Sequence, residues 1–339
     1  MASKKNQRPT TLKDVADQCG VSKAAASLAL NRSEEDCPLL PATRRKIRAA
    51  ARRLGYRPNW RAKALADRRT HLIGWMTPRP IPHLGRVYMD LAMALAKQFW
   101  QSRYQLTFVT TTEQGATLLD GRMDGCIVTD IVTPALRKAL TDANLPTVMI
   151  NVETDLPYSH ILADDRMGGR LATRHLLDLG HRRIVFLQGQ DKGEERYNHY
   201  SRVQREEGYK EAMRQAGFES QIRVVWEWPA RLADEIRSGG EVPTAVVAYS
   251  DDEAMRFQRA CWERGLVVPR DVSVVGFNNL PYTAHFIPPL TVIDFPAKEM
   301  GQAGADLLVR CLQEESVEPQ RIVLPETLVV RKSTAAPRS

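Results

Sequence analysis

Residues 10–31 carry the pattern of two short helices joined by a tight turn. Apolar positions recur at helical spacing in the first of them, and Thr11 stands three residues before Asp14, which is the spacing of a capping box. Gly20 interrupts this helix, and Ser22 is placed to cap a second helix of similar length. The pattern predicts a helix-turn-helix.

The second helix, from Lys23 to about Leu30, separates small apolar residues from a more accessible face. We expect its alanines to pack closely against the first helix. The N-terminus of this helix is then narrow and positively charged, so it fits a DNA major groove, where base edges and phosphates accept hydrogen bonds. An ordinary helical hairpin, with alanines and valines filling a core, is the alternative at this point. The positions expected to be accessible are Lys23, Ala24, Ser27 and Leu28.

A third helix is predicted to begin near Pro41 and to end at Gly55, with Tyr56 packing back on a three-helix core. The segment of residues 60–70 has helical spacing but few apolar anchors, so it predicts a linker helix too short to be stable by itself. Leu65 is an apolar residue among basic neighbours on this linker. That character suits a wedge between base pairs in a minor groove.

From His71 onward the pattern changes to short apolar strands that alternate with amphipathic helices. Repeated units of this kind are typical of parallel sheets covered by helices on both faces, and their number predicts two sheets. We expect the helix over residues 297–313 to return to the first sheet. Ligands are expected at the carboxyl ends of strands, in the cleft between two subdomains. The predicted strands are HLIGWM, YQLTFVTT, GCIVT, PTVMIN, HILA, RIVFLQ, IRVVWEW, TAVVAY, DVSVVGF, PLTVID, RIVLPE and LVVRK.

The expected fold class is therefore a small all-α helix-turn-helix headpiece followed by an α/β core of two parallel-sheet subdomains. A chain of 339 residues is long enough for such a headpiece and a body with substantial cores. The expected boundaries are 1–58 for the headpiece, 59–70 for the hinge helix and 71–333 for the core, in which subdomain one covers about 71–162 and 292–320 and subdomain two about 163–291 and 321–333.

Charge is distributed unevenly along the chain. Residues 1–70 contain 17 Lys and Arg against 6 Asp and Glu, a net charge of +11, whereas the remaining residues contain 31 against 34, a net charge of −3. A solvated charged face does not require such segregation, but the neutralisation of phosphates does. The charge therefore favours DNA binding over an ordinary helical hairpin.

No stretch approaches the ~18 apolar residues of a membrane span, and the start MASKKNQRPTT has no apolar core of a signal peptide. We therefore expect a cytoplasmic, nucleoid-associated protein with no membrane partner. The five cysteines are scattered and form no CxxC pair, so they are expected to be buried reduced thiols. No metal site and no cofactor are predicted.

Two other classes of protein are weighed against a DNA-binding regulator. A cytoplasmic sugar-binding sensor without DNA function is disfavoured by the basic headpiece. For a sugar-acting enzyme, the candidate carboxylate pairs are Asp164–Asp165 and Asp251–Asp252. Neither pair has the surroundings of a persuasive site, and no GxSxG or HExxH motif occurs, so we expect no enzymatic activity and no catalytic residues.

Seven sequence segments, taken together and in order, are much more specific for a protein family than any one of them alone. They are TLKDVADQCGVS, TRRKIRAAARRLGYRPN, LIG after the linker, DDRMGGRLATRHLLDLGHRRIVFL, REEGYKEAM, VPRDVSVVGFNN and IPPLTVI. In this order they resemble the lactose and galactose repressor (LacI/GalR) family of bacterial transcription regulators, over essentially the whole chain. The resemblance implies a DNA-binding headpiece, a hinge helix, a core similar to periplasmic sugar-binding proteins, and a dimer on a pseudopalindromic operator.

The resemblance assigns DNA contacts within the headpiece. Lys23, Ala24 and Leu28 occupy base-reading positions, and Ser22 and Ser27 occupy positions that contact the DNA backbone. Lys23 could donate to a guanine edge. Because Leu28 replaces a polar base-reading residue, the operator is expected to depart from the common family sequence. The DNA-binding residues implied in this way are Thr11, Ser22, Lys23, Ala24, Ser27, Leu28, Asn31, Tyr56, Asn59, Ala62 and Leu65.

The resemblance also implies a site for a small effector in the core, which we expect to be a sugar. A guanidinium, carboxylates and amides can hold sugar hydroxyls, and an aromatic ring can stack on the apolar face of the sugar. Arg205 matches the arginine that grips ligand oxygens, with a surface ion pair as its alternative role, and Trp228 matches the stacking aromatic, with core packing as its alternative. Asp251 and Asp252 could instead cap the next helix. The effector-binding candidates are His83, Tyr88, Thr129, Asn151, Arg205, Trp228, Ser250, Asp251 and Asn278.

The function expected is that of a transcriptional repressor whose affinity for double-stranded operator DNA is controlled by a small ligand. The chain ends soon after Val330, without the leucine-rich tail that makes some members of the family tetramers. A homodimer is therefore expected.

Overall fold

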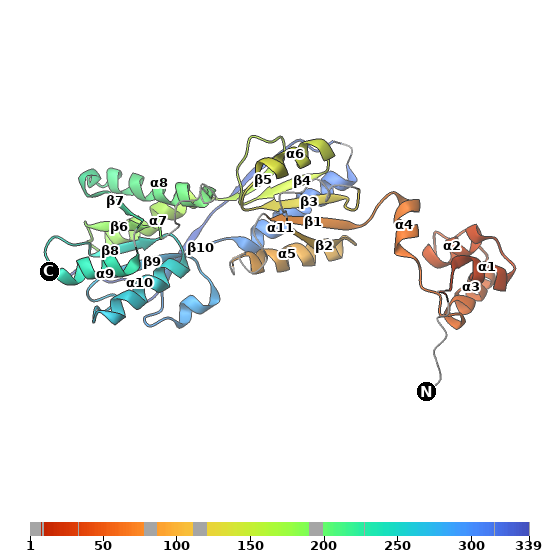
Figure 1. The fold of residues 1–339 in the computed structure, drawn as a ribbon, viewed down its shortest axis with the longest axis horizontal. Helices are drawn as coiled ribbons and strands as arrows, with labels where there is room; N and C mark the ends of the chain where they lie inside the picture. Colours follow the sequence, from red (N-terminus) through yellow and green to blue (C-terminus); the bar gives the residue numbers. More distant parts are fainter. Residues whose placement is uncertain are drawn as a thin grey trace, which may run out of the picture. The chain divides into compact units, whose positions relative to one another are not determined.

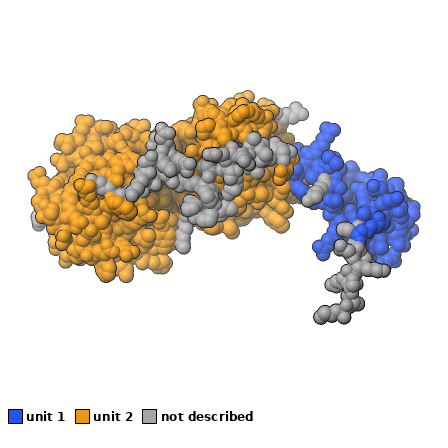
Figure 2. All heavy atoms as spheres, viewed as in Figure 1, with its two compact units in different colours: residues 1–70 blue, residues 71–339 orange. Residues whose placement is uncertain are grey.

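The chain separates into two compact units, residues 1–70 and residues 71–339, which Figure 2 draws in blue and orange. The caps and apolar periodicity of the first unit produce helices, and the strand–helix alternation of the second produces two sheets, as the pattern predicts. The computed structural model describes residues 8, 10–32, 34–77, 87–110, 121–189, 199–226, 228–314 and 316–338.

Within the described residues of the smaller unit, three helices pack around a small apolar core, and a fourth helix contributes no residue to this core. Ala26 and Ala29 are fully buried, and with Val15 and Ile47 they allow the helices to approach closely. The all-α headpiece is thus confirmed. Its helices are α1 (Leu12–Cys19), α2 (Lys23–Asn31), α3 (Pro41–Arg53) and α4 (Trp60–Asp67) (Figure 1).

The described residues of the larger unit form two six-stranded sheets. All neighbours in the first sheet are parallel, and in the second sheet only β12 runs antiparallel, to β10. The first sheet has the order β11 (Arg321–Leu324), β5 (Ser159–Ala163), β4 (Thr147–Ile150), β3 (Gly125–Thr129), β1 (Leu72–Thr77), β2 (Gln105–Thr110), and the second has the order β12 (Thr327–Val329), β10 (Thr291–Asp294), β9 (Ser273–Asn278), β8 (Ala245–Ala248), β6 (Ile184–Leu187), β7 (Arg223–Val225) (Figure 1).

Each sheet is covered on both faces by helices whose apolar residues join the strands in separate clusters. α5 and α11 pack together on one face of the first sheet and α6 on the other, while α7 and α8 oppose α9 and α10 across the second sheet. The late helix α11 therefore returns to the first sheet, as expected. The helices are α5 (Val87–Gln101), α6 (Pro134–Ala143), α7 (Asp165–Asp178), α8 (Tyr200–Gln215), α9 (Pro229–Ser238), α10 (Asp251–Glu263) and α11 (Ala297–Gln313).

Among the described strands, the chain passes between the two sheets three times, and two of these passages differ from the expected boundaries. β10 pairs with β9 in the second sheet, although residues from 292 were expected in subdomain one. β11 pairs with β5 in the first sheet, although residues from 321 were expected in subdomain two. The expectation was wrong because an apolar strand pattern does not specify which sheet edge the strand extends.

Candidate functional site

The helix-turn-helix is held by local caps at both helix starts. The Thr11 hydroxyl accepts from the Asp14 amide at 3.3 Å, and the Asp14 carboxylate accepts from the Thr11 amide at 2.8 Å, so the predicted capping box is confirmed. Gly20 ends α1 with φ 66°, a left-handed conformation that suits glycine. Ser22 then caps α2 by accepting from the Ala25 amide at 3.1 Å.

The face of α2 that points away from the headpiece core contains the residues expected to contact DNA. Lys23 and Ala24 are exposed, while Ser27 and Leu28 are half-buried. Asn31 is exposed, and its amide donates to the Ser27 hydroxyl at 3.1 Å. The face therefore begins with one ammonium group at the helix N-terminus and continues with methyl and hydroxyl groups.

Two arginines of α3, which sequence reasoning did not single out, fix the other end of α2. Arg48 donates from Nε to the carbonyl of Ala29 at 3.1 Å and forms an ion pair with Glu34 at 2.9 Å. Arg44, only 9% exposed, donates to the Glu34 carbonyl at 2.7 Å. Cations near a helix C-terminus are stabilised by its unpaired carbonyls, so these side chains secure the orientation of α2. This role could not be predicted from the sequence, because both arginines lie at helical spacing among the other basic residues of α3.

The linker helix α4 is open to solvent along its described side chains. Leu65 is 84% exposed, and Ala62 is exposed as well, with its amide 3.4 Å from the side-chain oxygen of Asn59. Tyr56 instead packs against the headpiece core. The exposed Leu65 side chain therefore takes no part in packing within this unit, because the headpiece core contains no residue of α4.

In the larger unit, two of the expected effector residues, Asn278 and Asp251, lie close to a third, Arg205, on α8. Arg205 is 3% exposed and donates from Nε to Asp165 at 2.7 Å, from Nη1 to the Tyr249 carbonyl at 2.9 Å and from Nη2 to Asn278 at 3.3 Å. Glu326 lies 3.6 Å from the same guanidinium. Arg205 therefore connects several buried groups and is not part of a surface ion pair. Most of its N–H donors already bind groups within the protein.

The surroundings of Arg205 are rich in buried carboxyl groups. Asp165 and Asp251 are fully buried, and Glu326 is nearly so. Burial raises the pKa of Asp251 to about 8, although the Leu280 amide and Arg205 act in the opposite direction. Burial and the neighbouring Asp165 raise the pKa of Glu326 well above its usual range. Because burial raises the pKa of these carboxyls and a single guanidinium only partly offsets the effect, part of this cluster stays protonated at neutral pH.

The N-terminus of α8 connects the two subdomains. The Ser201 hydroxyl donates to the side-chain oxygen of Asn151, which follows β4, at 3.3 Å. His199 lies 3.7 Å from Asp130, which follows β3. Groups at the carboxyl ends of first-sheet strands therefore meet the start of a helix of the second subdomain, next to Arg205, where open α/β sheets bind ligands.

An aromatic residue that sequence reasoning missed contributes to this cluster. Arg202, one turn before Arg205, lies 5.4 Å from the ring centre of Trp226 and 4.6 Å from that of Tyr249. Trp226 is half exposed. Trp228, the predicted stacking residue, is also half exposed, so it does not belong to the core, and it stands at the N-cap position of α9. The signal that could have revealed Trp226 is its position directly after β7.

Other candidates take local structural roles. Thr129 is fully buried and accepts from the Trp75 indole at 2.8 Å, while Tyr88 packs edge-on against the same indole. Ser250, and not Asp251 or Asp252, caps α10 by accepting from the Glu253 amide at 3.3 Å, so the alternative capping role of the aspartates was wrong. His83 lies outside the described residues.

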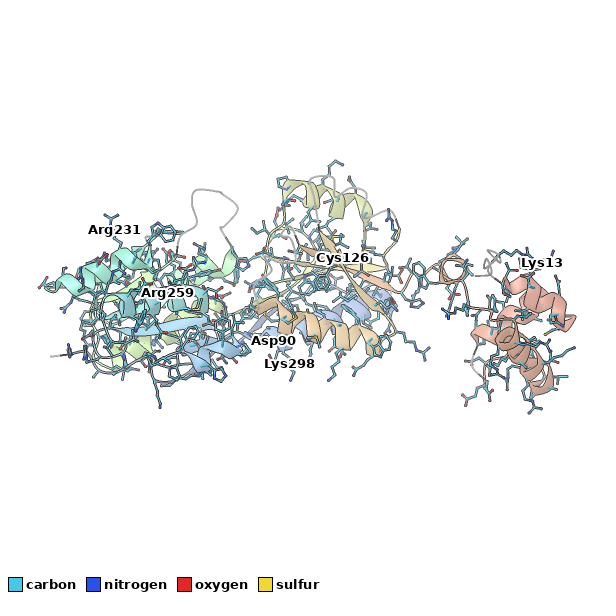
Figure 3. The ribbon with its side chains drawn as sticks, turned by 60° about the horizontal axis from the view of Figure 1, so that its bottom comes forward. Lys13, Asp90, Cys126, Arg231, Arg259 and Lys298 are labelled. Atoms are coloured by element: carbon cyan, nitrogen blue, oxygen red, sulfur yellow. The ribbon has the colours of Figure 1, made fainter. Side chains whose placement is uncertain are left out.

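Metal and redox chemistry find no support within the described part of the chain. There, no group of three or more His, Cys, Asp or Glu residues could hold a metal ion. All five cysteines are free, and four of them are buried. Cys126 lies within the first sheet (Figure 3), and burial raises the pKa of its thiol to about 12, which keeps it protonated. Across the same described residues, no helix combines the length and apolarity needed to cross a bilayer.

A capped helix-turn-helix joined to a core of two parallel sheets defines a DNA-binding regulator with a ligand-binding type of core. Residues 11–59 match the description "Bacterial regulatory proteins, lacI family", and residues 173–334 match "Periplasmic binding protein-like domain". The lactose operon repressor of Escherichia coli is 30% identical, with 98% of this chain and 92% of that protein covered. The HTH-type transcriptional regulator DegA of Bacillus subtilis is 29% identical, with 96% and 98% covered.

Two solved structures extend the similarity to the fold. A lac repressor dimer bound to operator and an anti-inducer has a TM-score of 0.82 at 28% identity and covers 97% of this chain and 100% of its own. A CelR–cellobiose complex has a TM-score of 0.69 at 27% identity and covers 96% and 99%. The chain belongs to the lacI family of bacterial regulatory proteins, which confirms the resemblance, and it is a DNA-binding transcriptional regulator. These relatives are named as regulators and not as enzymes.

Proposed function

We propose that the protein is a homodimeric repressor, acting in the cytoplasm on chromosomal DNA, whose affinity for a pseudopalindromic operator is set by a sugar bound next to Arg205. The observation that carries this proposal is the combination, in one chain, of an exposed α2 on a capped helix-turn-helix and a polar cluster shared by two subdomains. The solved structure of a lac repressor dimer bound to operator supports the DNA-binding part of this proposal, and that of a CelR–cellobiose complex supports the sugar-binding part.

On DNA, α2 enters the major groove with its N-terminus first, and the α4 helices of two protomers lie in the minor groove. Ser22 and Lys23 face phosphates and base edges at that N-terminus, where backbone amides add positive potential. Leu65 inserts between base pairs, because an exposed leucine among basic residues gains burial only by entering the stack. The remaining contacts are assigned to Thr11, Ala24, Ser27, Leu28, Asn31, Tyr56, Asn59 and Ala62.

The second protomer covers an apolar face of the core. Met89, Met93 and Trp100 lie on one side of α5, and Met255 and Trp262 lie on one side of α10. The side chain of Trp100 is 74% exposed and that of Trp262 is 78% exposed. Together with the three methionines, they form a larger apolar surface than isolated exposed residues would. Met93→Asp is expected to convert a dimer to a monomer in sedimentation equilibrium. An unchanged dimer would show that this face is not the interface.

A sugar suits the polar cluster because hydroxyl groups can both donate and accept. Asn151, Ser201 and Asn278 offer neutral partners, Arg202 offers a cation, and Trp226 offers a ring for the apolar face of the sugar. A ligand that contacts both subdomains favours one arrangement of them over another, which changes the affinity for DNA. By linkage, DNA changes the affinity for that ligand by the same factor.

The proposal is tested by selecting fragments from a genomic DNA library with the purified protein at moderate salt, with and without a mixture of sugars. Recovery of a short pseudopalindrome whose binding changes with sugar is expected. Retention of fragments that share no sequence would overturn the proposal. Incubation of the protein with the same sugars is expected to yield no product, and turnover would instead favour an enzyme.

The proposed effector site is tested with one arginine removed and an exposed arginine as control. Arg202→Gln is expected to abolish the response of operator binding to sugar while DNA binding itself persists. Arg231→Gln, at the exposed outer side of α9 (Figure 3), is the matched control. A normal response of Arg202→Gln to sugar would refute the assignment. Arg205 is less suitable for this test because its loss leaves buried carboxylates unpaired.

A further inference from the structure

The outward face of α2 is divided into two strips. Residues four apart lie above one another on a helix, so Lys23 and Ser27 form one strip, and Ala24 and Leu28 form the next. The first strip carries an ammonium group and a hydroxyl. The second carries only methyl groups, from one exposed alanine and one half-buried leucine.

The half-buried side chain of Leu28 does not belong to the apolar cluster that α1, α2 and α3 share. Its carbonyl accepts from the Arg32 amide and from the Cys37 thiol. Leu30, two residues on, packs against that cluster. Among the described residues, those partly buried against this cluster are Leu12, Val21, Leu30, Leu39, Leu54 and Tyr56.

The polar groups of α2 lie at its two ends and along one strip. Lys23 is the single charged side chain of this helix, all of whose residues are described. The Asn31 amide uses one of its two N–H donors on the Ser27 hydroxyl, which ties this side chain to the first strip. Between Lys23 at one end and Asn31 at the other, the strip of Ala24 and Leu28 therefore presents methyl groups to the groove.

The major groove offers one apolar feature, the C5-methyl group of a pyrimidine, which thymine carries and methylated cytosine shares. We propose that each operator half-site presents C5-methyl groups to the strip formed by Ala24 and Leu28, so that recognition there depends on the methyl group itself. Four residues of helix rise about 6 Å, roughly two base steps, so the two side chains meet pyrimidines one or two steps apart. This inference rests on the proposed function.

The experiment replaces each thymine of a selected half-site in turn by deoxyuridine, which removes the methyl group and keeps every hydrogen-bonding atom. Binding of the full-length protein is measured by fluorescence anisotropy. At one or two positions, affinity is expected to fall about threefold to tenfold, which is the size of the effect of removing one buried methyl group. Uniform tolerance of deoxyuridine would overturn the inference.

Protein variants connect the effect to one side chain. Leu28→Ala is expected to bind less tightly and to lose sensitivity to deoxyuridine at one position, while the thermal stability of the headpiece stays unchanged. Leu30→Ala is the matched control: it lowers headpiece stability and, at a temperature where the headpiece is folded, keeps the deoxyuridine effect. Retention of the full effect in Leu28→Ala would refute the role of that residue.

A second arm distinguishes thymine from methylated cytosine as the source of the methyl group. At the sensitive position, a cytosine is compared with 5-methylcytosine in otherwise identical DNA. Tighter binding of the methylated site is expected, and equal binding contradicts methyl recognition. If the library yields no shared half-site, the proposed function itself fails and this inference fails with it. If a half-site is found but its methyl groups are without effect, only this inference fails.

Discussion

Replacing Asp251 by asparagine is expected to flatten the pH dependence of stability. The Asp251 side chain is fully buried, one oxygen accepts from the Leu280 amide at 2.8 Å, and the other has no hydrogen-bond partner among the described residues. Burial raises its pKa to about 8 in the folded chain, from 3.8 for an aspartate exposed to water. The folded state therefore holds this proton more tightly than the unfolded state does.

The sign and the size follow from this difference. Below pH 4 the carboxyl is protonated in both states and costs nothing, whereas between pH 4 and pH 8 folding requires the uptake of a proton. At about 1.4 kcal/mol per pH unit, the free energy of unfolding falls by up to ~4 kcal/mol between pH 5 and pH 8. Asp251→Asn keeps an acceptor for Leu280 and removes the titration, so this fall is expected to be smaller in the variant.

Urea unfolding of the full chain, followed by tryptophan fluorescence at pH 5, 6, 7 and 8 and constant ionic strength, measures the effect. The variant is expected to gain about 2–4 kcal/mol on the wild type from pH 5 to pH 8. Glu241→Gln, at an exposed position of the same subdomain, is the control and should follow the wild type. Parallel pH curves for wild type and Asp251→Asn would refute the reasoning about this buried carboxyl.

Three further predictions concern packing, capping and DNA. In Gly208→Ala, the added Cβ overlaps the Arg166 carbonyl of α7, so a loss of about 1–3 kcal/mol in urea unfolding is expected despite better helix propensity, and unchanged stability would contradict it. Thr11→Ala removes the capping box and should cost the headpiece about 1 kcal/mol in thermal unfolding; an unaltered melting curve would speak against the cap. Leu65→Ala should weaken operator binding more than non-specific binding, and equal losses on both DNAs would exclude insertion.

Much of the headpiece could be predicted because its determinants are local. The capping box at Thr11, the left-handed Gly20 and the Ser22 cap each depend on residues within one helical turn. What the sequence did not reveal is the pair of α3 arginines at the end of α2. Arg48 contacts Ala29 of α2, 19 residues away, and Arg44 contacts Glu34 in the following loop, 10 residues away, so both contacts depend on how α3 packs.

The proposed effector site was predicted less completely. Arg205, Asn278 and Asn151 were singled out, and the structure brings them to one region, yet Thr129 turns inward to the Trp75 indole. The buried contacts of Arg205 also escaped prediction, because Asp165 and Glu326 reach it from segments 40 or more residues away in either direction.

By itself, the sequence determined the elements of this protein, its charged headpiece and the strand–helix alternation, because caps and hydrophobic periodicity act over a few residues. Tertiary structure decided which sheet each late strand joins and which charges are buried together. The close approach of α7 and α8 likewise sets a requirement that only the tertiary structure reveals, because a Cβ at Gly169 would overlap the Arg205 carbonyl. Glycine at this position is required by a neighbour 36 residues away, and such a requirement exists only once both helices have packed on the same sheet.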